Sequence, residues 1–270
     1  MARARVLVRP LVALSAGLLL VSGCGASGAS SKDASHDTSG KSAAGPVVVA
    51  TTSWEAALAK AAGAKNVKSL VPASIRHAPD YDLKPSDLSA VAEADYVLYA
   101  PFEPFAGRIK EAAGSRAKMI DLELDNAPAK TSANVTRLGK AFGTEQAAAK
   151  WNAALAAEWK SLAGRLKAAR PDGKAPAVAS QVFTTWAAKL AGARLVGTYG
   201  PEAVSPAQLS RLSAKKPAFV LENENMSTGT VLPGSGAKQL NIVNYPGKDL
   251  DLLAVYRKAA EQMKKAFAAS

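Results

Sequence analysis

Few side chains in this sequence have the chemistry of a metal ligand. Two histidines occur, His36 and His77, and the single cysteine is Cys24. Zinc sites favour imidazole and thiolate ligands with carboxylate, whereas manganese accepts more oxygen ligands. His77 and Glu222 are therefore the candidate metal ligands, in a site dominated by oxygen donors. Further oxygens are available from Asp80, Glu103, Glu224 and Tyr245.

Aromatic side chains offer a second kind of site. A pocket for an organic molecule or a metal chelate could be lined by Trp54, Phe102, Phe105, Trp186 and Tyr245. The same rings could instead belong to the core, an interpretation that suits Phe105 and Trp186 better than Trp54. The full set of candidate ligand-binding residues is Trp54, His77, Glu103, Gln181, Glu222, Glu224 and Tyr245.

Nothing in the sequence indicates an enzyme. It has no Gly-x-Ser-x-Gly motif, no phosphate-binding loop, no His–Glu metalloprotease pair and no cysteine that would serve as a nucleophile. Glu222 and Glu224 are a pair of carboxylates, but glycosidase carboxylates lie on opposite sides of a substrate, and neighbours in one strand are poorly placed for that. We therefore expect a binding protein without a catalytic cofactor.

The N-terminus has the pattern of an export signal. Arg3, Arg5 and Arg9 form a basic segment, and the apolar run 11–21 that follows is too short to span a bilayer. Small residues then lead directly to Cys24, which resembles the lipobox of a bacterial lipoprotein, in which the cysteine is lipidated and becomes the mature N-terminus. Lipidation also accounts for a lone cysteine in an exported protein. We expect an extracytoplasmic protein, attached to the cell membrane through Cys24.

A flexible tether is expected after the cysteine. Residues 1–23 form the predicted signal peptide, and residues 24–45 are rich in Ser, Gly and Ala, without apolar periodicity. The formal net charge is +12, which falls to +9 when the three arginines of residues 1–23 are removed. The remaining Lys and Arg are scattered along expected helices, with no basic run interleaved with aromatic residues. We therefore expect no nucleic-acid partner.

The elements that position the candidate residues alternate between strand and helix. Strands are expected over residues 46–52, 67–71, 94–100, 118–122, 175–182, 193–198, 218–222 and 240–244. Between the two groups of strands, the region 131–170 is predicted to be helical with one break, at Gly143. The second of its helices, over 145–169, is long and amphipathic. Alternation of this kind is typical of parallel sheets covered by helices.

The sequence thus predicts an α/β protein with two lobes, each a mostly parallel sheet flanked by helices, joined by a long rigid helix. The N-terminal lobe covers 46–130, the linking helices 131–170 and the C-terminal lobe 171–270. Open α/β sheets bind ligands beyond the carboxyl ends of their strands. Trp54, His77 and Glu103 follow the first three strands, and residues 222–225 end the central strand of the second lobe. These positions are expected to converge between the lobes.

Three segments resemble the extracytoplasmic substrate-binding lipoproteins of ABC importers, in particular the zinc- and manganese-type group. The segment from Asp80 through Val97 is similar to that family's His-x-Tyr-x-x-x-Pro-Ser-Asp motif and the strand after it. The segments 204–209 and 218–222 are similar to its second-lobe helix and strand. The lipobox, the tether and the long helix agree with the family's general plan, so that the resemblance covers nearly all of the mature chain.

The departures from the family pattern concern its four metal ligands. The first family histidine falls on Pro79, and the nearest imidazole is that of His77. The second has no counterpart, because no histidine follows His77. The third falls near Ser180 and Gln181, and the family's aspartate falls on Tyr245. The family's four-ligand metal site is therefore not present in its usual form.

The resemblance implies a monomeric protein that captures a divalent metal ion, zinc or manganese, between its lobes and delivers it to the permease of an ABC importer. Two alternatives remain open. The ligand could be a metal chelate or another small organic molecule, as in the related siderophore- and cobalamin-type binders. The chain could also be a lipoprotein without a transport role, such as an adhesin, built on the same fold.

Overall fold

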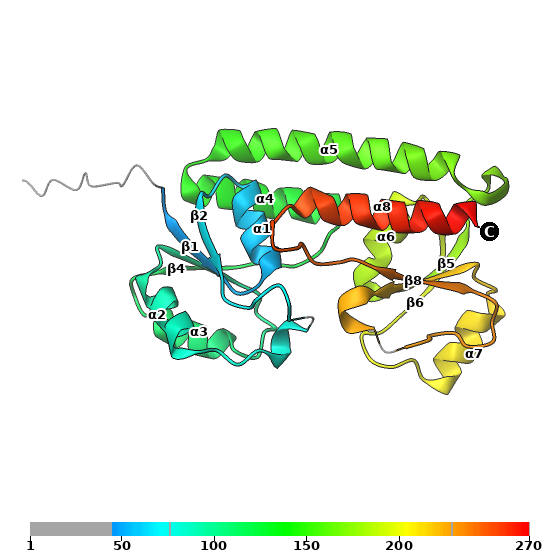
Figure 1. Cartoon of the computed structure of the whole chain (residues 1–270), viewed down its shortest axis with the longest axis horizontal. Helices are drawn as coiled ribbons and strands as arrows, with labels where there is room; N and C mark the ends of the chain where they lie inside the picture. The colour runs from blue at the N-terminus through cyan, green and yellow to red at the C-terminus, as the bar shows by residue number, and fades with distance from the viewer. Residues whose placement is uncertain (1–44, 76, 228, 270) are drawn as a thin grey trace, which may run out of the picture. The chain divides into compact units, whose positions relative to one another are not determined.

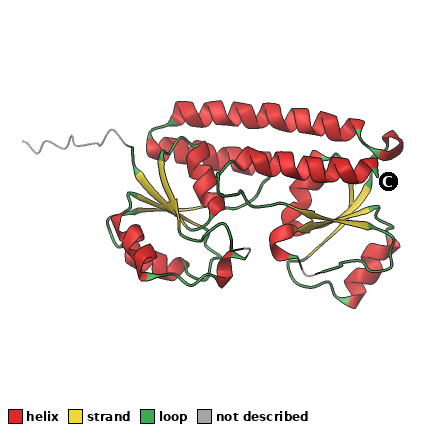
Figure 2. Cartoon of the chain, viewed as in Figure 1, coloured by secondary structure: helices red, strands yellow, loops and turns green. Residues whose placement is uncertain are grey.

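Two parallel sheets form the framework of the protein (Figure 2). The computed structural model describes residues 45–75, 77–227 and 229–269. The first sheet has four strands in the order β2-β1-β3-β4 and the second has four in the order β6-β5-β7-β8, and every pairing is parallel. The strands are β1 Val47–Ala50, β2 Asn66–Ser69, β3 Tyr96–Tyr99, β4 Lys118–Asp121, β5 Ala177–Gln181, β6 Arg194–Tyr199, β7 Phe219–Asn223 and β8 Lys238–Ile242. The two sheets therefore repeat one topology, and the predicted fold class is confirmed.

Helices connect the strands and join the two lobes. They are α1 Ser53–Ala61, α2 Pro85–Glu93, α3 Ala106–Ala113, α4 Pro128–Phe142, α5 Glu145–Ala168, α6 Thr185–Leu190, α7 Pro206–Ala214 and α8 Leu252–Ala268. The predicted break is present at Gly143, which ends α4 in the left-handed conformation with a φ of 69°. Glycine adopts this conformation at little cost, so α5 can begin two residues later and fold back on α4.

The start of α2 is fixed by Asp87. The helix begins at Pro85, because Asp87 reaches back and its Oδ2 accepts the backbone N–H of Lys84 at 2.9 Å. The same oxygen accepts the hydroxyl of Tyr81 at 2.9 Å. Tyr81 and Asp87 thus fix the loop that enters α2.

A layer formed by α4, α5 and α8 lies against both sheets (Figure 1). Helix α5 packs against α4 and α8, and α8 also contacts α1 of the first lobe and α6 of the second. On α5 the buried residues are Ala148, Leu155, Leu162 and Leu166, so that one side of the helix faces the layer beneath it.

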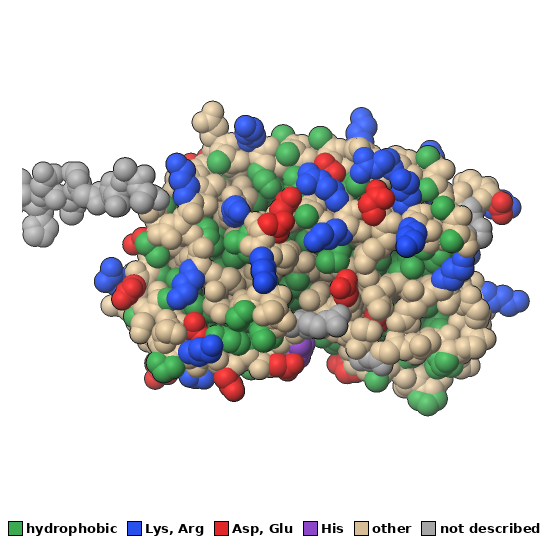
Figure 3. Space-filling view, in the orientation of Figure 1, with side chains coloured by type: hydrophobic (Ala, Val, Ile, Leu, Met, Phe, Trp, Pro, Cys, Tyr) green, Lys and Arg blue, Asp and Glu red, His purple; other side chains and the backbone are tan. Residues whose placement is uncertain are grey.

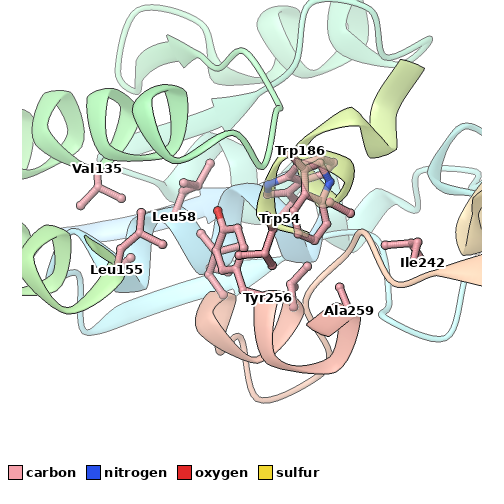
Figure 4. Close-up of a cluster of buried hydrophobic side chains, with 14 of the residues drawn as sticks. Trp54, Leu58, Val135, Leu155, Trp186, Ile242, Tyr256 and Ala259 are labelled. Carbon is pink, nitrogen blue, oxygen red and sulfur yellow. The ribbon is translucent and has the colours of Figure 1, made fainter. Parts of the chain in front are cut away.

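One cluster of buried hydrophobic side chains extends through this layer into both lobes (Figure 4). It joins Leu58 of α1 and Val135 of α4 to Trp186 of α6, Ile242 of β8 and Tyr256 of α8. Smaller clusters lie on the other face of each sheet. The lobes therefore share a core on the side of the linking helices.

No helix within the described part of the chain is both long and apolar enough to cross a bilayer. The predicted signal peptide, Cys24 and the tether lie outside the described residues.

Candidate ligand-binding cleft between the lobes

A cavity of about 240 Å³ lies between the two lobes. The first lobe contributes Thr52 and Ser53, at the start of α1, and the loop 71–78 after β2. The second lobe contributes Glu224 and Asn225 after β7, and Tyr245 with its neighbours after β8. All these segments follow the carboxyl ends of parallel strands, where this class of sheet binds ligands. The face drawn in Figure 3 is hollowed at its lower edge, with acidic side chains on both sides.

Trp54 and Tyr245 meet across the lobes. Their ring centroids are 4.9 Å apart with an interplanar angle of 70°, an edge-to-face arrangement. Trp54 is buried, whereas Tyr245 is partly exposed and lines the cavity. Next to this pair, the Ser53 hydroxyl donates to the carbonyl of Pro246 at 3.0 Å. The start of α1 and the segment after β8 are thus in direct contact at one end of the cavity.

His77 lies in the loop that borders the cavity. Its Nδ1 is 2.9 Å from Oδ1 of Asp80, and both side chains are substantially exposed, at 42% and 73%. Ile75 and Ala78, on either side of it in sequence, line the cavity. The imidazole is therefore near the cleft, in a pair with one carboxylate.

Gln181 and Glu222 belong to the interior of the second lobe. Both are at most 1% exposed. The hydroxyl of Tyr199 donates to Oε2 of Glu222, and the burial of Tyr199 followed by this carboxylate raises the pKa of the tyrosine. Gln181 packs beneath Gly200, whose φ is +78° and where a Cβ would stand 3.0 Å from the Gln181 side chain. Glu224, two residues after Glu222, faces the cavity instead.

A pair of buried carboxyl groups, Glu55 and Glu103, lies at the carboxyl ends of the adjacent strands β1 and β3. Glu55 is 0% exposed, and its Oε2 accepts the backbone N–H of Thr52 at 3.1 Å and the hydroxyl of the same residue. Glu103 is 5% exposed, and its Oε2 accepts the N–H of Ala100 at 3.0 Å. Each carboxyl thus folds back onto the strand end that precedes it.

These two groups interact electrostatically. Burial raises the pKa of Glu55, and burial together with the charge of Glu55 raises the pKa of Glu103 to about 8. Burial and then the charges of Glu55 and Glu103 raise the pKa of the Tyr245 phenol, which lies close to both. Tyr245, which lines the cavity, is therefore within electrostatic reach of the pair, although neither Glu55 nor Glu103 lines the cavity itself.

Solved structures match this architecture. A zinc-bound deletion mutant of ZnuA aligns with a TM-score of 0.64 and 17% identity, over 84% of this chain and 99% of that chain. Lmb of Streptococcus agalactiae, a laminin-binding protein with adhesin and metal transporting activity, aligns with a TM-score of 0.61 and 14% identity, over 81% and 100%. FpvC of Pseudomonas aeruginosa in complex with Mn²⁺ aligns with a TM-score of 0.59 and 17% identity, over 83% and 97%.

This chain has the fold of metal-binding solute-binding proteins. No family model matches the sequence, and no curated protein matches it. At these identities the likeness establishes the fold, and the ligand is a separate question.

On this solute-binding fold, the candidate residues fall into separate groups. Trp54 is in contact with Tyr245, Glu103 is within electrostatic reach of Tyr245, and Tyr245 and Glu224 both line the cavity from the second lobe. His77 lies at the rim, while Gln181 and Glu222 are inside the second lobe. Among the described residues, no three His, Cys, Asp or Glu side chains are grouped so as to hold a metal ion.

Sequence reasoning did not single out Glu55. Thr52 and Glu55 have the Thr-x-x-Glu spacing of a capping box, and both reciprocal hydrogen bonds are present. That signal explains one oxygen of Glu55 but not its proximity to Glu103, which depends on the pairing of β1 with β3.

Proposed function

We propose that this protein is a lipid-anchored, extracytoplasmic solute-binding protein that captures a divalent metal ion between its lobes and delivers it to an ABC importer. The observation that carries the proposal is a cavity lined by the strand ends of both lobes, in a fold whose solved examples include proteins with zinc and manganese bound. The cavity is lined by Glu224 and Tyr245 of the second lobe and by Thr52 and Ser53 of the first, whose side chains carry oxygens that are suitable donors for a cation.

The ligand chemistry favours manganese over zinc. His77 supplies the one imidazole of the described residues, and it is paired with Asp80 at the rim. Oxygen donors dominate the remaining candidates: Glu55, Glu103, Glu224 and Tyr245. Manganese accepts such a ligand set more readily than zinc, which prefers nitrogen and sulfur.

Membrane attachment follows from the sequence pattern around Cys24. In our proposal, the lipid on Cys24 holds the protein at the outer surface of the cell membrane, and residues 25–45 allow it to reach the permease. Lys and Arg are scattered among Asp and Glu on the face drawn in Figure 3, in agreement with the absence of a nucleic-acid partner from this proposal.

A second candidate ligand is a metal chelate or a small organic molecule. A second cavity, of about 190 Å³, is lined by Trp54 and the segment 123–125 of the first lobe and by Val182 and Phe183 of the second. The side chains of Val182 and Phe183 are 38% and 44% exposed, which is unusual for large apolar residues at strand ends. An apolar ligand would bury this surface.

Thermal unfolding in the presence of ligands tests the proposal. A ligand at 100 times its dissociation constant adds about 2.7 kcal/mol to the free energy of unfolding, which is readily measured. We expect the metal-free protein to be stabilised by Mn²⁺, and less by Zn²⁺ at equal concentration. If ferric or cobalt chelates stabilise the protein and the free ions do not, the ligand is a metal chelate and not a metal ion. No response to any of them would favour a lipoprotein without a transport role.

A further inference from the structure

The buried carboxyl groups of Glu55 and Glu103 have no cationic partner. In the described part of the chain, no salt bridge joins either of them to a Lys, Arg or His side chain. A carboxylate out of contact with water is costly unless it is paired, protonated or bound to a metal ion. Two such groups next to each other cannot both be ionised without a compensating positive charge. The pair therefore binds either a proton or a cation.

Two oxygen atoms at this place lack hydrogen-bond partners. They are Oε1 of Glu55 and the hydroxyl oxygen of Thr51, both in residues that are 0% exposed. The Thr51 hydroxyl lies beside both carboxyl groups and lowers the pKa of each, although it makes no hydrogen bond of normal geometry with either. Buried oxygens without partners are rare in proteins, and a bound ion or water is a usual partner for such atoms.

We propose that Thr51, Glu55 and Glu103 form an oxygen-only site for a hard divalent cation, closed on its cavity side by the phenol of Tyr245. This inference rests on the proposed function, since it names the residues that hold the captured ion. The site lies within the first lobe and does not use His77, Gln181 or Glu222, the positions to which the sequence resemblance directs attention. Two carboxylates and two neutral oxygens match the charge and the donor type of Mn²⁺.

Tyr245 connects this site to the cavity. Its side chain lines the cavity, packs edge-on against Trp54, and places its hydroxyl near both carboxyl groups. Tyr245 also belongs to the second lobe, so the ion would be enclosed between the lobes although its carboxylates come from one of them. Entry of the ion requires displacement of this ring.

The test uses Mn²⁺ as the probe and compares two sets of variants of the full chain. Glu103→Gln keeps the size of the side chain and an oxygen acceptor for Ala100, and we expect it to weaken Mn²⁺ binding by on the order of 100-fold. Thr51→Val removes only the hydroxyl and should weaken binding by about 10-fold. The matched control is Glu202→Gln, at an exposed carboxylate that does not line the cavity, and it should change affinity by less than about 3-fold. His77→Ala and Glu224→Gln are measured in parallel, because they represent the competing assignment of the ligands.

A folding defect is excluded by the metal-free unfolding midpoint, which Glu103→Gln should leave unchanged or raise, since it removes a buried acid. If His77→Ala or Glu224→Gln abolishes Mn²⁺ binding while Glu103→Gln does not, this assignment is wrong and the proposed function stands. If the wild type does not bind Mn²⁺ at all, both this site and the metal ligand are wrong.

Discussion

Asn126 and Asn244 are hydrogen-bonded to each other across the two lobes. Nδ2 of Asn126 donates to the backbone carbonyl of Asn244 at 2.9 Å and to its side-chain oxygen at 3.0 Å. The indole of Trp186 donates to the same side-chain oxygen at 2.8 Å, and the hydroxyl of Tyr256 donates to the carbonyl of Asn126 at 3.0 Å. Both asparagines are at most 1% exposed. This network fixes the chain segments that pass between the lobes behind the cleft.

Removal of the Asn126 amide should therefore destabilise the whole protein. We expect Asn126→Ala to lower the free energy of unfolding by about 2–3 kcal/mol, because it leaves buried oxygens of Asn244 short of a donor. The matched control is Asn152→Ala, whose amide bonds to Ser132 and Thr136 at the partly exposed contact of α4 with α5. That change should cost less than about 1 kcal/mol. Equal losses in denaturant titrations of the two variants would contradict a special role of Asn126.

The contact between α4 and α5 predicts opposite effects of one substitution at two glycines. A Cβ at Gly139 of α4 would stand 2.5 Å from Cβ of Ala148, whereas one at Gly164 of α5 has nothing within 4 Å. Gly139→Ala should therefore cost about 1–3 kcal/mol through overpacking. Gly164→Ala should add about 0.5–1 kcal/mol, because alanine is the better helix former. Thermal unfolding of the two variants checks the predicted loss and the predicted gain of stability. A gain of stability in Gly139→Ala would show that α4 and α5 separate easily.

The buried pair Glu55 and Glu103 predicts a loss of stability as the pH rises. The folded-state pKa of Glu103 is about 8 against an ordinary value of 4.5, so the folded protein holds this proton more tightly than the unfolded chain does. The contribution of this proton to the free energy of unfolding is complete below about pH 4.5 and is lost as the pH rises through about 8. For the metal-free protein it amounts to on the order of 5 kcal/mol, and Glu55, whose pKa is also raised, adds to it in the same direction.

Denaturant titrations between pH 5 and 9, in the presence of a chelator, measure this dependence. Glu103→Gln should flatten the decline with pH, because glutamine does not titrate. Glu202→Gln, at an exposed carboxylate, should leave the decline as in the wild type. A wild-type protein whose stability does not change over this range would show that the carboxyl group is hydrated in solution.

Loss of the cysteine thiol should separate anchoring from folding. We expect Cys24→Ala protein to be recovered in the medium, because lipidation requires the thiol, with an unfolding midpoint equal to that of the same chain cleaved after the tether. Labelling with a fatty-acid analogue measures lipid attachment directly. Membrane retention of the variant would mean that another segment attaches the protein.

The sequence was sufficient to predict the fold because its signals are local. Gly143 ends a helix by its own conformational freedom, and β-branched runs such as 47–49 mark buried strands without reference to the rest of the chain.

The candidate site was less predictable, since it depends on which strand ends become neighbours. Phe105 and Trp186 are in the core, as the sequence analysis favoured. Trp54 is also buried, and its partner Tyr245 is distant in sequence. Glu55 is the clearest example of what the sequence does not predict. Its spacing from Thr52 indicates only a helix cap, and its proximity to Glu103 depends on the pairing of β1 with β3.

The hydrophobic cluster shared by the lobes has a consequence for cooperativity. It includes Val48 and Leu98 of the first sheet and Val178 and Phe219 of the second, so neither sheet can unfold without exposing apolar surface of the other. Unfolding is then a single calorimetric transition, with equal van 't Hoff and calorimetric enthalpies, in spite of the two separate sheets. An ion held by carboxylates of the first lobe alone would protect backbone amides of the second sheet against hydrogen exchange.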